Sequence, residues 1–360
     1  MFSRMMGIMR MVLVVVALLR LDAEALDVVK LRRVAARNNL TCILVFGDSS
    51  VDPGNNNRLP TTAKGNFRPY GKNFFGGRPT GRLTNGRLPT DIIAEAFGVT
   101  RLIPAFLDPN LKKEDLLHGV SFASASSGYD DLTANLAKVL PLSKQVEYLM
   151  HYKIHLRRLV GEKIAVETIR NAIFIVSAGT NDFLANYFLE PTRSKQFTVD
   201  GYADYLIDHV SNLTKAIHRL GGTRFVVVGI PPLGCIPIVR TLTGQTDCAN
   251  HYNQVASLFN SKLKDRLATL KKLLGVRTAY IDAYKTLINA TKRPMTYGFT
   301  VTSRGCCGSG TVEVGETCKG QSTCMDPTKY IYWDAVHPTE RMYEFIANDA
   351  VRPIIKEIFI

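Results

Sequence analysis

The stretch Cys42-Ile43-Leu44-Val45-Phe46-Gly47-Asp48-Ser49-Ser50 is an apolar run that stops at a glycine and continues into polar residues. Short apolar runs bounded by a turn signal are typical of strands buried on both faces of a parallel sheet. Ligands of such sheets bind beyond the carboxyl ends of the strands. Ser49 therefore follows a predicted strand at the edge where a reactive side chain is useful, and Cys42 is predicted to be a free, buried thiol.

Four more apolar runs resemble the first, so we predict a five-stranded parallel sheet. They cover residues 119–123, 172–178, 224–230 and 278–281. Between and after the runs lie helical patterns, at 89–97, 142–160, 199–220, 249–274 and 341–358. Strands that alternate with helices predict right-handed crossovers and helices on both faces of the sheet. The class is therefore α/β.

The N-terminus has the pattern of a secretory signal peptide. Arg4 and Arg10 precede the apolar stretch 11–19, and Ala23-Glu24-Ala25 has the small-x-small pattern of a cleavage site. We expect removal of residues 1–25, with 26–360 as a single domain because no linker or repeat interrupts it. An uncleaved anchor is the alternative. No other segment is long and apolar enough to span a bilayer, so we expect no stable membrane anchor.

Cysteines and sequons agree with a secretory route. Six cysteines are candidates for disulfides, which an oxidising compartment would form, although spacing leaves fifteen pairings open. They are Cys235, Cys248, Cys306, Cys307, Cys318 and Cys324. A zinc site is the rival interpretation, but the chain has no C-x-x-C pair or nearby histidine cluster, so we expect no metal. The three N-glycosylation candidates are Asn39, Asn212 and Asn289, of which Asn39 is the least certain because it adjoins the first strand.

The net charge of +14 limits the choice of partners. Loss of residues 1–25 removes three arginines and two acidic residues and leaves +13. The positive residues are scattered and no nucleic-acid motif is present, so we expect no nucleic-acid partner. A basic solvated surface is the simpler interpretation; electrostatic retention on an acidic polysaccharide is the alternative.

A serine, a histidine and an aspartate are the candidate catalytic residues. Ser49 needs a base to become a nucleophile, and His337 is the candidate base. Asp334 lies three residues before His337, so on a helical turn its carboxylate would reach the imidazole and fix its tautomer. Candidate oxyanion donors are the Asn181 side chain, the backbone N–H of Ser49 and an N–H from the turn 124–128.

These blocks, in this order, resemble the GDSL (SGNH) esterase/lipase superfamily, and the secondary motifs resemble its secreted plant branch. The similarity runs from about residue 42 to the end. The blocks are Gly47-Asp48-Ser49, the turn after Ser121-Phe122-Ala123, Gly179-Thr180-Asn181-Asp182 and Asp334-x-x-His337; the secondary motifs include 51–57, 79–87, Gly234-Cys235-x-Pro237, 305–308 and 332–340. The resemblance implies a three-layer, flavodoxin-like α/β/α fold and ester hydrolysis without metal or cofactor. It also implies Ser49 as nucleophile, His337 as base, Asp334 as its partner and Asn181 as an oxyanion donor.

One block departs from the family pattern. Ser126 stands where the family usually has glycine, and Gly128 follows two residues later. Glycine is favoured where φ must be positive or a ligand approaches closely. We nevertheless expect Ser126 to donate its backbone N–H to the oxyanion and the chain to stay active.

We therefore predict a secreted, glycosylated serine esterase or lipase that acts through an acyl-enzyme. Its substrate would be an acyl lipid or an acetylated cell-wall polysaccharide. The expected location is extracellular or the cell wall, with the ER lumen as the other compartment on that route. Two alternatives stay open: acyl transfer from the same acyl-enzyme to an alcohol, and a lipid- or glycan-binding protein weakened in catalysis at Ser126.

Overall fold

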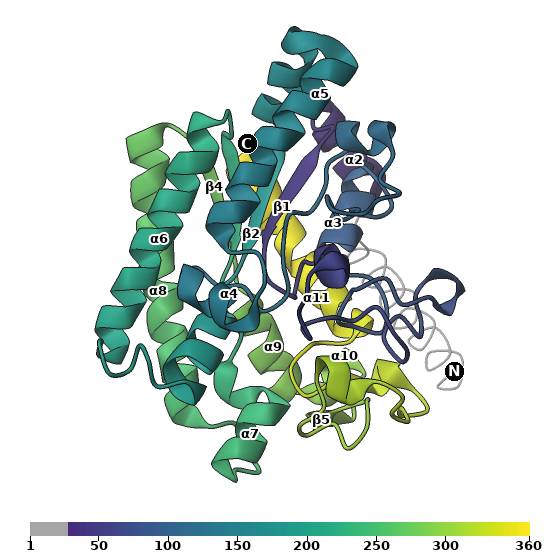
Figure 1. Cartoon of the computed structure of the whole chain (residues 1–360), viewed down its shortest axis with the longest axis vertical. Coiled ribbons are helices and arrows are strands. Elements are labelled where there is room, and N and C mark those ends of the chain that lie inside the picture. Colours follow the sequence, from purple (N-terminus) through teal and green to yellow (C-terminus); the bar gives the residue numbers. More distant parts are fainter. Residues whose placement is uncertain (1–27) are drawn as a thin grey trace, which may run out of the picture.

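A central parallel sheet organises the molecule, whose computed structural model describes residues 28–360 (Figure 1). The expected signal peptide, residues 1–25, lies outside the described residues. Four strands pair in the order β1-β2-β3-β4, all parallel. They are β1 Ile43–Gly47, β2 Ile173–Ser177, β3 Arg224–Val228 and β4 Arg277–Ile281. Each coincides with a predicted strand to within two residues at either end.

The fifth predicted strand, 119–123, is only partly regular, so the count of five regular strands was wrong. Val45 exchanges hydrogen bonds with this segment, donating to Val120 and accepting from Phe122 at 3.0 and 2.8 Å. Only Ser121 forms a bridge to β1, and its own carbonyl points to the other side, where the Asn55 side chain and the Phe106 N–H bond it. Counted with this segment, the spatial order is 2-1-3-4-5, the flavodoxin-like order, with its switch point at β1.

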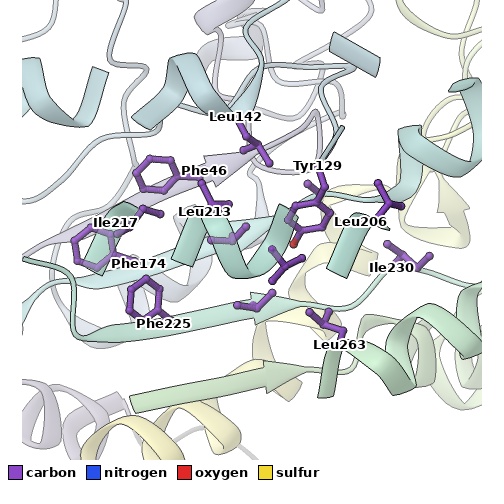
Figure 2. Packing of buried hydrophobic residues seen from close by; sticks show 14 of the residues in the cluster. Phe46, Tyr129, Leu142, Phe174, Leu206, Leu213, Ile217, Phe225, Ile230 and Leu263 are labelled. Carbon is purple, nitrogen blue, oxygen red and sulfur yellow. The ribbon is translucent and has the colours of Figure 1, made fainter. Parts of the chain in front are cut away.

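Helices cover both faces of the sheet and make three layers (Figure 1). The aromatic residues Phe46, Phe174 and Phe225 lie on the face covered by the first group of helices (Figure 2). Aliphatic residues such as Ile175 and Val226 lie on the opposite face. The first group is α5 Leu142–Asn171, α6 Val199–Arg219 and α8 Asn250–Leu274; the second is α2 Val28–Arg37, α3 Pro89–Phe97 and α11 Glu340–Ile354.

Several elements exceed the prediction. Helix α5 continues to Asn171 past Gly161, whose φ of 81° marks a kink, rather than ending near 160. After α11, which contains Pro353, a π-helical turn Ile355–Phe359 follows. Short elements that the apolar pattern did not indicate are α4 Asp131–Ala137, the π-helical segment Asp182–Leu189, α7 Pro237–Thr243, α9 Ala283–Lys292, α10 Pro294–Tyr297 and the parallel pair β5 Val301–Gly305 and β6 Tyr330–Tyr332.

Six cysteines form three disulfides, which contradicts the zinc interpretation. The pairs are Cys235–Cys248, Cys306–Cys324 and Cys307–Cys318. Cys42 is free and fully buried, as predicted, directly before β1. Burial raises the pKa of its thiol to about 12, although the Tyr152 hydroxyl at 3.3 Å favours the thiolate. Cys42 is therefore an unreactive core residue.

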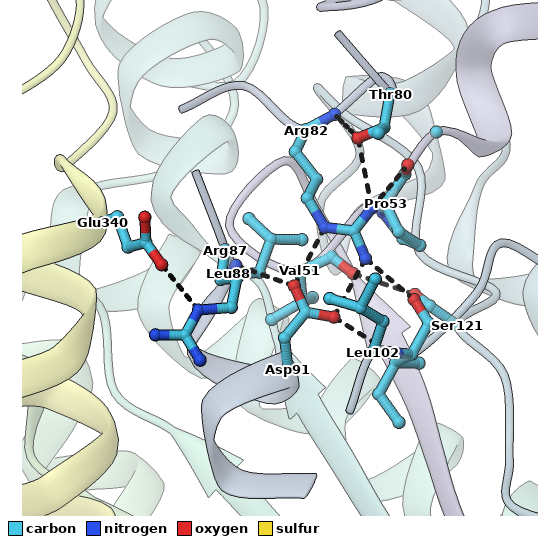
Figure 3. A network of polar contacts seen from close by, with 12 residues as sticks. Val51, Pro53, Thr80, Arg82, Arg87, Leu88, Asp91, Leu102, Ser121 and Glu340 are labelled. Atoms are coloured by element: carbon cyan, nitrogen blue, oxygen red, sulfur yellow. Dashed lines mark hydrogen bonds and ion pairs between the residues drawn. The ribbon is translucent and has the colours of Figure 1, made fainter. Parts of the chain in front are cut away.

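The loop before α3 is held by a buried ion pair (Figure 3). Arg82 donates two hydrogen bonds to the Asp91 carboxylate, each 2.9 Å, and Asp91 also accepts the backbone N–H groups of Leu88 and Ile103. A buried, bidentate and fully bonded pair of this kind is costly to break, by about 3–5 kcal/mol when one partner is removed. It fixes the long loop that packs against the C-terminal part of the chain.

The N-glycosylation candidates differ in accessibility. Asn39 is exposed in the turn after α2, with a φ of 54°, and Asn212 is exposed on α6. Asn289 is half-buried on α9. Their modification stays a prediction, with Asn39 no less accessible than Asn212. Between residues 28 and 360, no helix has the length and apolar character to cross a membrane.

Candidate active site

The structure brings Ser49, His337 and Asp334 together at the carboxyl end of β1. Nε2 of His337 lies 2.8 Å from Oγ of Ser49, and Nδ1 lies 2.8 Å from Oδ2 of Asp334. Because a carboxylate only accepts hydrogen bonds, Nδ1 carries the ring proton and Nε2 is free to accept from the serine. All three residues are nearly inaccessible, at 9% exposed for Ser49, 6% for His337 and 0% for Asp334. The arrangement is that of a hydroxyl beside an oriented base.

Asp334 reaches His337 from a bend, not from the helical turn that the spacing suggested. Its Oδ1 accepts the backbone N–H groups of Val336 and His337, at 2.8 and 2.6 Å. These two bonds hold residues 334–337 in a tight bend, so the Asp334 carboxylate reaches the His337 ring without a helix. The preceding residue, Trp333, is anchored by its carbonyl to the N–H of Cys307 at 2.8 Å, next to two disulfides. Helix α11 begins only at Glu340.

Tyr70 is a site residue that the sequence analysis missed. Its hydroxyl donates to Oδ2 of Asp334 at 2.7 Å and accepts the N–H of Gly315 at 2.7 Å, and the residue is fully buried. Burial, and next the Asp334 charge, raise the pKa of the Tyr70 hydroxyl, so it stays a donor. Tyr70 lies in the loop before α3, far from Asp334 in sequence, and nothing in its immediate neighbours marks it.

Ser126 adopts a φ of 69°, so the turn does require the left-handed conformation that favours glycine. Its neighbour Ala125 is held at both ends of its backbone. The Ala125 N–H donates to Asp52 at 2.9 Å, and its carbonyl accepts from Asn56 at 3.0 Å. The N–H groups of Ser49 and Ser126 have no hydrogen-bond partner within the described residues. They are therefore available to an incoming oxyanion.

Asn181 connects the end of β2 to the same turn. Its side-chain amide donates to the carbonyl of Ser127 at 2.9 Å, and the residue lines a cavity together with Ser49 and His337. The second amide hydrogen remains for a ligand. The next residue, Asp182, fixes the other side of the turn, because its carboxylate accepts the N–H groups of Tyr129 and Asp130 at 2.8 and 3.1 Å. A Cβ on Gly128 would lie 2.2 Å from that carboxylate, so the position requires glycine.

Three further buried carboxyl groups, besides Asp334, lie around the site. Burial is the largest cause of a raised pKa at each of them: it raises the pKa of Asp48, that of Asp52 to about 6 and that of Asp182 to about 7. Asp48 bonds Ser50 in its own turn. Asp52 and Asp182 each accept backbone N–H groups on the two sides of Ser126. All three accept hydrogen bonds that hold the loops around Ser49 and Ser126 in place.

Sequence and structure comparisons show which known proteins this chain resembles. A GDSL esterase/lipase of Arabidopsis thaliana is 53% identical over 349 residues, 97% of this chain and 98% of that protein. A second from the same plant is 42% identical over 314 residues, 86% and 90% of the two chains. Among solved structures, a goat-rumen metagenome lipase aligns with 85% of this chain and 94% of its own at a TM-score of 0.39 and 13% identity. An acetylxylan esterase of Geobacillus stearothermophilus, a catalytic mutant, aligns with 87% and 94% at 0.39 and 14%.

The two structural likenesses are too distant to support an argument, but the sequence comparisons are close and nearly complete. The profile described as GDSL-like Lipase/Acylhydrolase matches residues 43–350, which include the strand before Ser49, the turn at Ser126, Asn181 and the Asp334/His337 bend. With that match and the 53% identity, the chain belongs to the GDSL-like lipase/acylhydrolase family and is a carboxylic ester hydrolase.

Proposed function

We propose that this ester hydrolase uses Ser49 as nucleophile, His337 as general base and Asp334 as the group that orients the imidazole. Ser49 Oγ forms a bond to the ester carbonyl carbon while its proton passes to Nε2 of His337. The carbonyl–alkoxy bond then breaks, and the leaving alcohol takes that proton. Water, deprotonated by His337, attacks the acyl-enzyme, and the proton returns to Ser49 as the acid leaves.

The negative oxygen of each tetrahedral intermediate would be stabilised by three donors. They are the unpaired backbone N–H groups of Ser49 and Ser126 and the free amide hydrogen of Asn181. Donors that are fixed before the reaction stabilise developing charge at little reorganisation cost, and one such donor is worth about 10²–10³ in kcat. The bonds from Asp52 and Asn56 to Ala125 support this role, because they hold the Ser126 peptide in place.

The observation that carries the proposal is the unbroken sequence of short contacts from Ser49 to His337 to Asp334. Each atom is in the position its role needs, and the base has no other protein acceptor or donor at Nε2 within the described residues. A histidine with only a structural role would not need both a buried carboxylate at one ring nitrogen and a serine hydroxyl at the other. The bend at Asp334 also brings two backbone donors to the carboxylate, which fix its position beside the imidazole.

The natural setting is part of the same proposal. We propose a secreted glycoprotein of the extracellular space or cell wall that hydrolyses an acyl-lipid ester or an acetylated cell-wall polysaccharide. The N-terminal pattern, three disulfides and exposed Asn39 and Asn212 support the secretory route. The net charge of +13 that remains after loss of residues 1–25 supports weak electrostatic retention on acidic polysaccharide, which salt extraction of intact tissue would test.

Hydrolysis of p-nitrophenyl acetate by the purified protein, compared with Ser49→Ala, tests the catalytic assignment. We expect kcat to fall by at least about 10³-fold, since residual rates come only from binding and the oxyanion donors. Ser50→Ala is the matched control, an adjacent serine outside the three residues, and should stay within about tenfold of wild type. A phosphonate ester should label one serine, located at Ser49 by mass spectrometry. Equal activity in Ser49→Ala and wild type would refute the assignment.

A further inference from the structure

An internal cavity begins at the proposed nucleophile and extends into the core. It encloses about 100 Å³ and touches Ser49 and His337 at one end. Its walls come from the face of the sheet opposite the aromatic residues, and from α9 and α11 packed over that face. Six aliphatic wall residues are at most 7% exposed: Ile175, Val226, Ile281, Leu287, Ile346 and Ala350. The buried side chains of Tyr332 and Tyr343 also line the cavity.

We propose that this cavity is the binding site for the acyl chain of the substrate, and that it selects unbranched aliphatic acyl groups of about four to six carbons. The inference rests on the proposed role of Ser49. Cavities lined by Leu, Ile and Phe stay dry and take up apolar ligands, and one of about 150 Å³ holds benzene with its six carbons. A cavity of about 100 Å³ therefore holds about four carbons beyond a carbonyl at Ser49.

The acyl part fits the cavity better than the alcohol part because of the order of the chemical steps. The acyl group stays bonded to Ser49 while water enters to complete the reaction. The alcohol must leave first, past His337, which gives it a proton. The aliphatic walls of the cavity belong to the buried core between the sheet and α11. A buried apolar wall therefore suits the group that stays bonded to Ser49, and the side next to His337 suits the group that departs.

Chain-length dependence follows from the apolar walls. Each methylene moved from water into such walls contributes about fourfold to kcat/KM. p-Nitrophenyl hexanoate should therefore exceed p-nitrophenyl acetate by at least about tenfold in kcat/KM. p-Nitrophenyl decanoate should fall below the hexanoate, because the chain outgrows the cavity.

Neighbouring valines on β3 provide a matched pair of variants. Val226 lines the cavity, whereas Val227 is equally buried but packs on the opposite face of the sheet. Val226→Met fills part of the empty space, so it should lower the hexanoate-to-acetate ratio of kcat/KM by about tenfold or more with little change in Tm. Val227→Met crowds a filled core, so it should lower Tm by a few degrees and leave the ratio unaltered.

The outcomes separate this inference from the proposed function. If no ester is hydrolysed faster by wild type than by Ser49→Ala, the proposed function fails. If Ser49-dependent hydrolysis is present but acetate is the best acyl donor, or Val226→Met and Val227→Met have equal ratios, the acyl cavity is refuted. The inference is also refuted if chain length matters only in a series of acetate esters with ethyl to hexyl alcohols, since the cavity would then hold the alcohol.

Discussion

Replacement of Ser126 by glycine tests how the unusual turn works. Ser126 is one of three non-glycine residues with positive φ among residues 28–360, and it stands where the sequence resemblance predicts glycine. A non-glycine residue in the left-handed region costs about 1–2 kcal/mol. Replacement by glycine removes this strain, but it also enlarges the unfolded ensemble, which lowers the stability by about 0.5–1 kcal/mol. We therefore expect Ser126→Gly to raise the free energy of unfolding by about 0–1.5 kcal/mol.

The rate should change little, because neighbours and not residue 126 itself aim the donor. Asp52 and Asn56 bond the N–H and carbonyl of Ala125, and Ser127 donates to the Gly47 carbonyl at 2.7 Å. With the turn held on both sides, the Ser126 N–H keeps its direction when the side chain is removed. We expect kcat for a short p-nitrophenyl ester to change by less than about tenfold, whereas regaining a lost oxyanion donor would raise it about 10²–10³-fold.

The matched control is Lys138→Gly, which replaces another left-handed residue, with φ 54°, at the end of α4. It should shift Tm to the same small extent as Ser126→Gly, with kcat unaltered. Steady-state kinetics and thermal unfolding of both variants provide the comparison. A rise in kcat of two orders of magnitude or more in Ser126→Gly alone would refute the argument, because it would mean that the serine misdirects the donor in the native protein.

Three further predictions concern groups around the site. Tyr70→Phe removes the hydroxyl bonded to Asp334, and should lower kcat about 10–100-fold with KM nearly constant, measured by steady-state kinetics; an unaltered kcat would contradict it. Burial raises the pKa of Asp182 to about 7 from 3.8, so the folded state holds the proton more tightly and stability falls as pH rises from about 4 to 7, by up to about 4 kcal/mol. Asp182→Asn should be less stable at low pH and show a shallower slope in urea unfolding, because Asp48 and Asp52 also have raised pKa values; a slope as steep as that of the wild type would argue against Asp182 as its main source. Replacing Cys306 and Cys324 by alanine should cost about 2–4 kcal/mol in unfolding free energy by the same method, and an unaltered midpoint would contradict a structural role.

The strands and main helices were predictable because their signals are local. β1 and α3 match their predicted bounds, because an apolar run and a proline in the first helical turn are signals contained in the local sequence. The prediction was wrong where distant groups decide the structure. The predicted fifth strand forms a single bridge to β1, and its Ser121 and Ala123 carbonyls are bonded by the distant Asn55 side chain. Helix α5 continues past Gly161 although its exposed second half has little apolar periodicity.

The sequence by itself determined the parallel sheet, the position of Ser49 after its first strand, and the pairing of His337 with an aspartate three residues earlier. These follow from patterns within a few residues of each other, so the order of the chain carries them. Only the tertiary structure decided that Tyr70 bonds Asp334, that Asp52 and Asn56 hold the Ser126 turn, and that a narrow apolar cavity begins at Ser49. Each of these joins segments far apart in the chain. Hydrogen-bond direction and the shape of a cavity depend on how the layers pack, which no local pattern specifies.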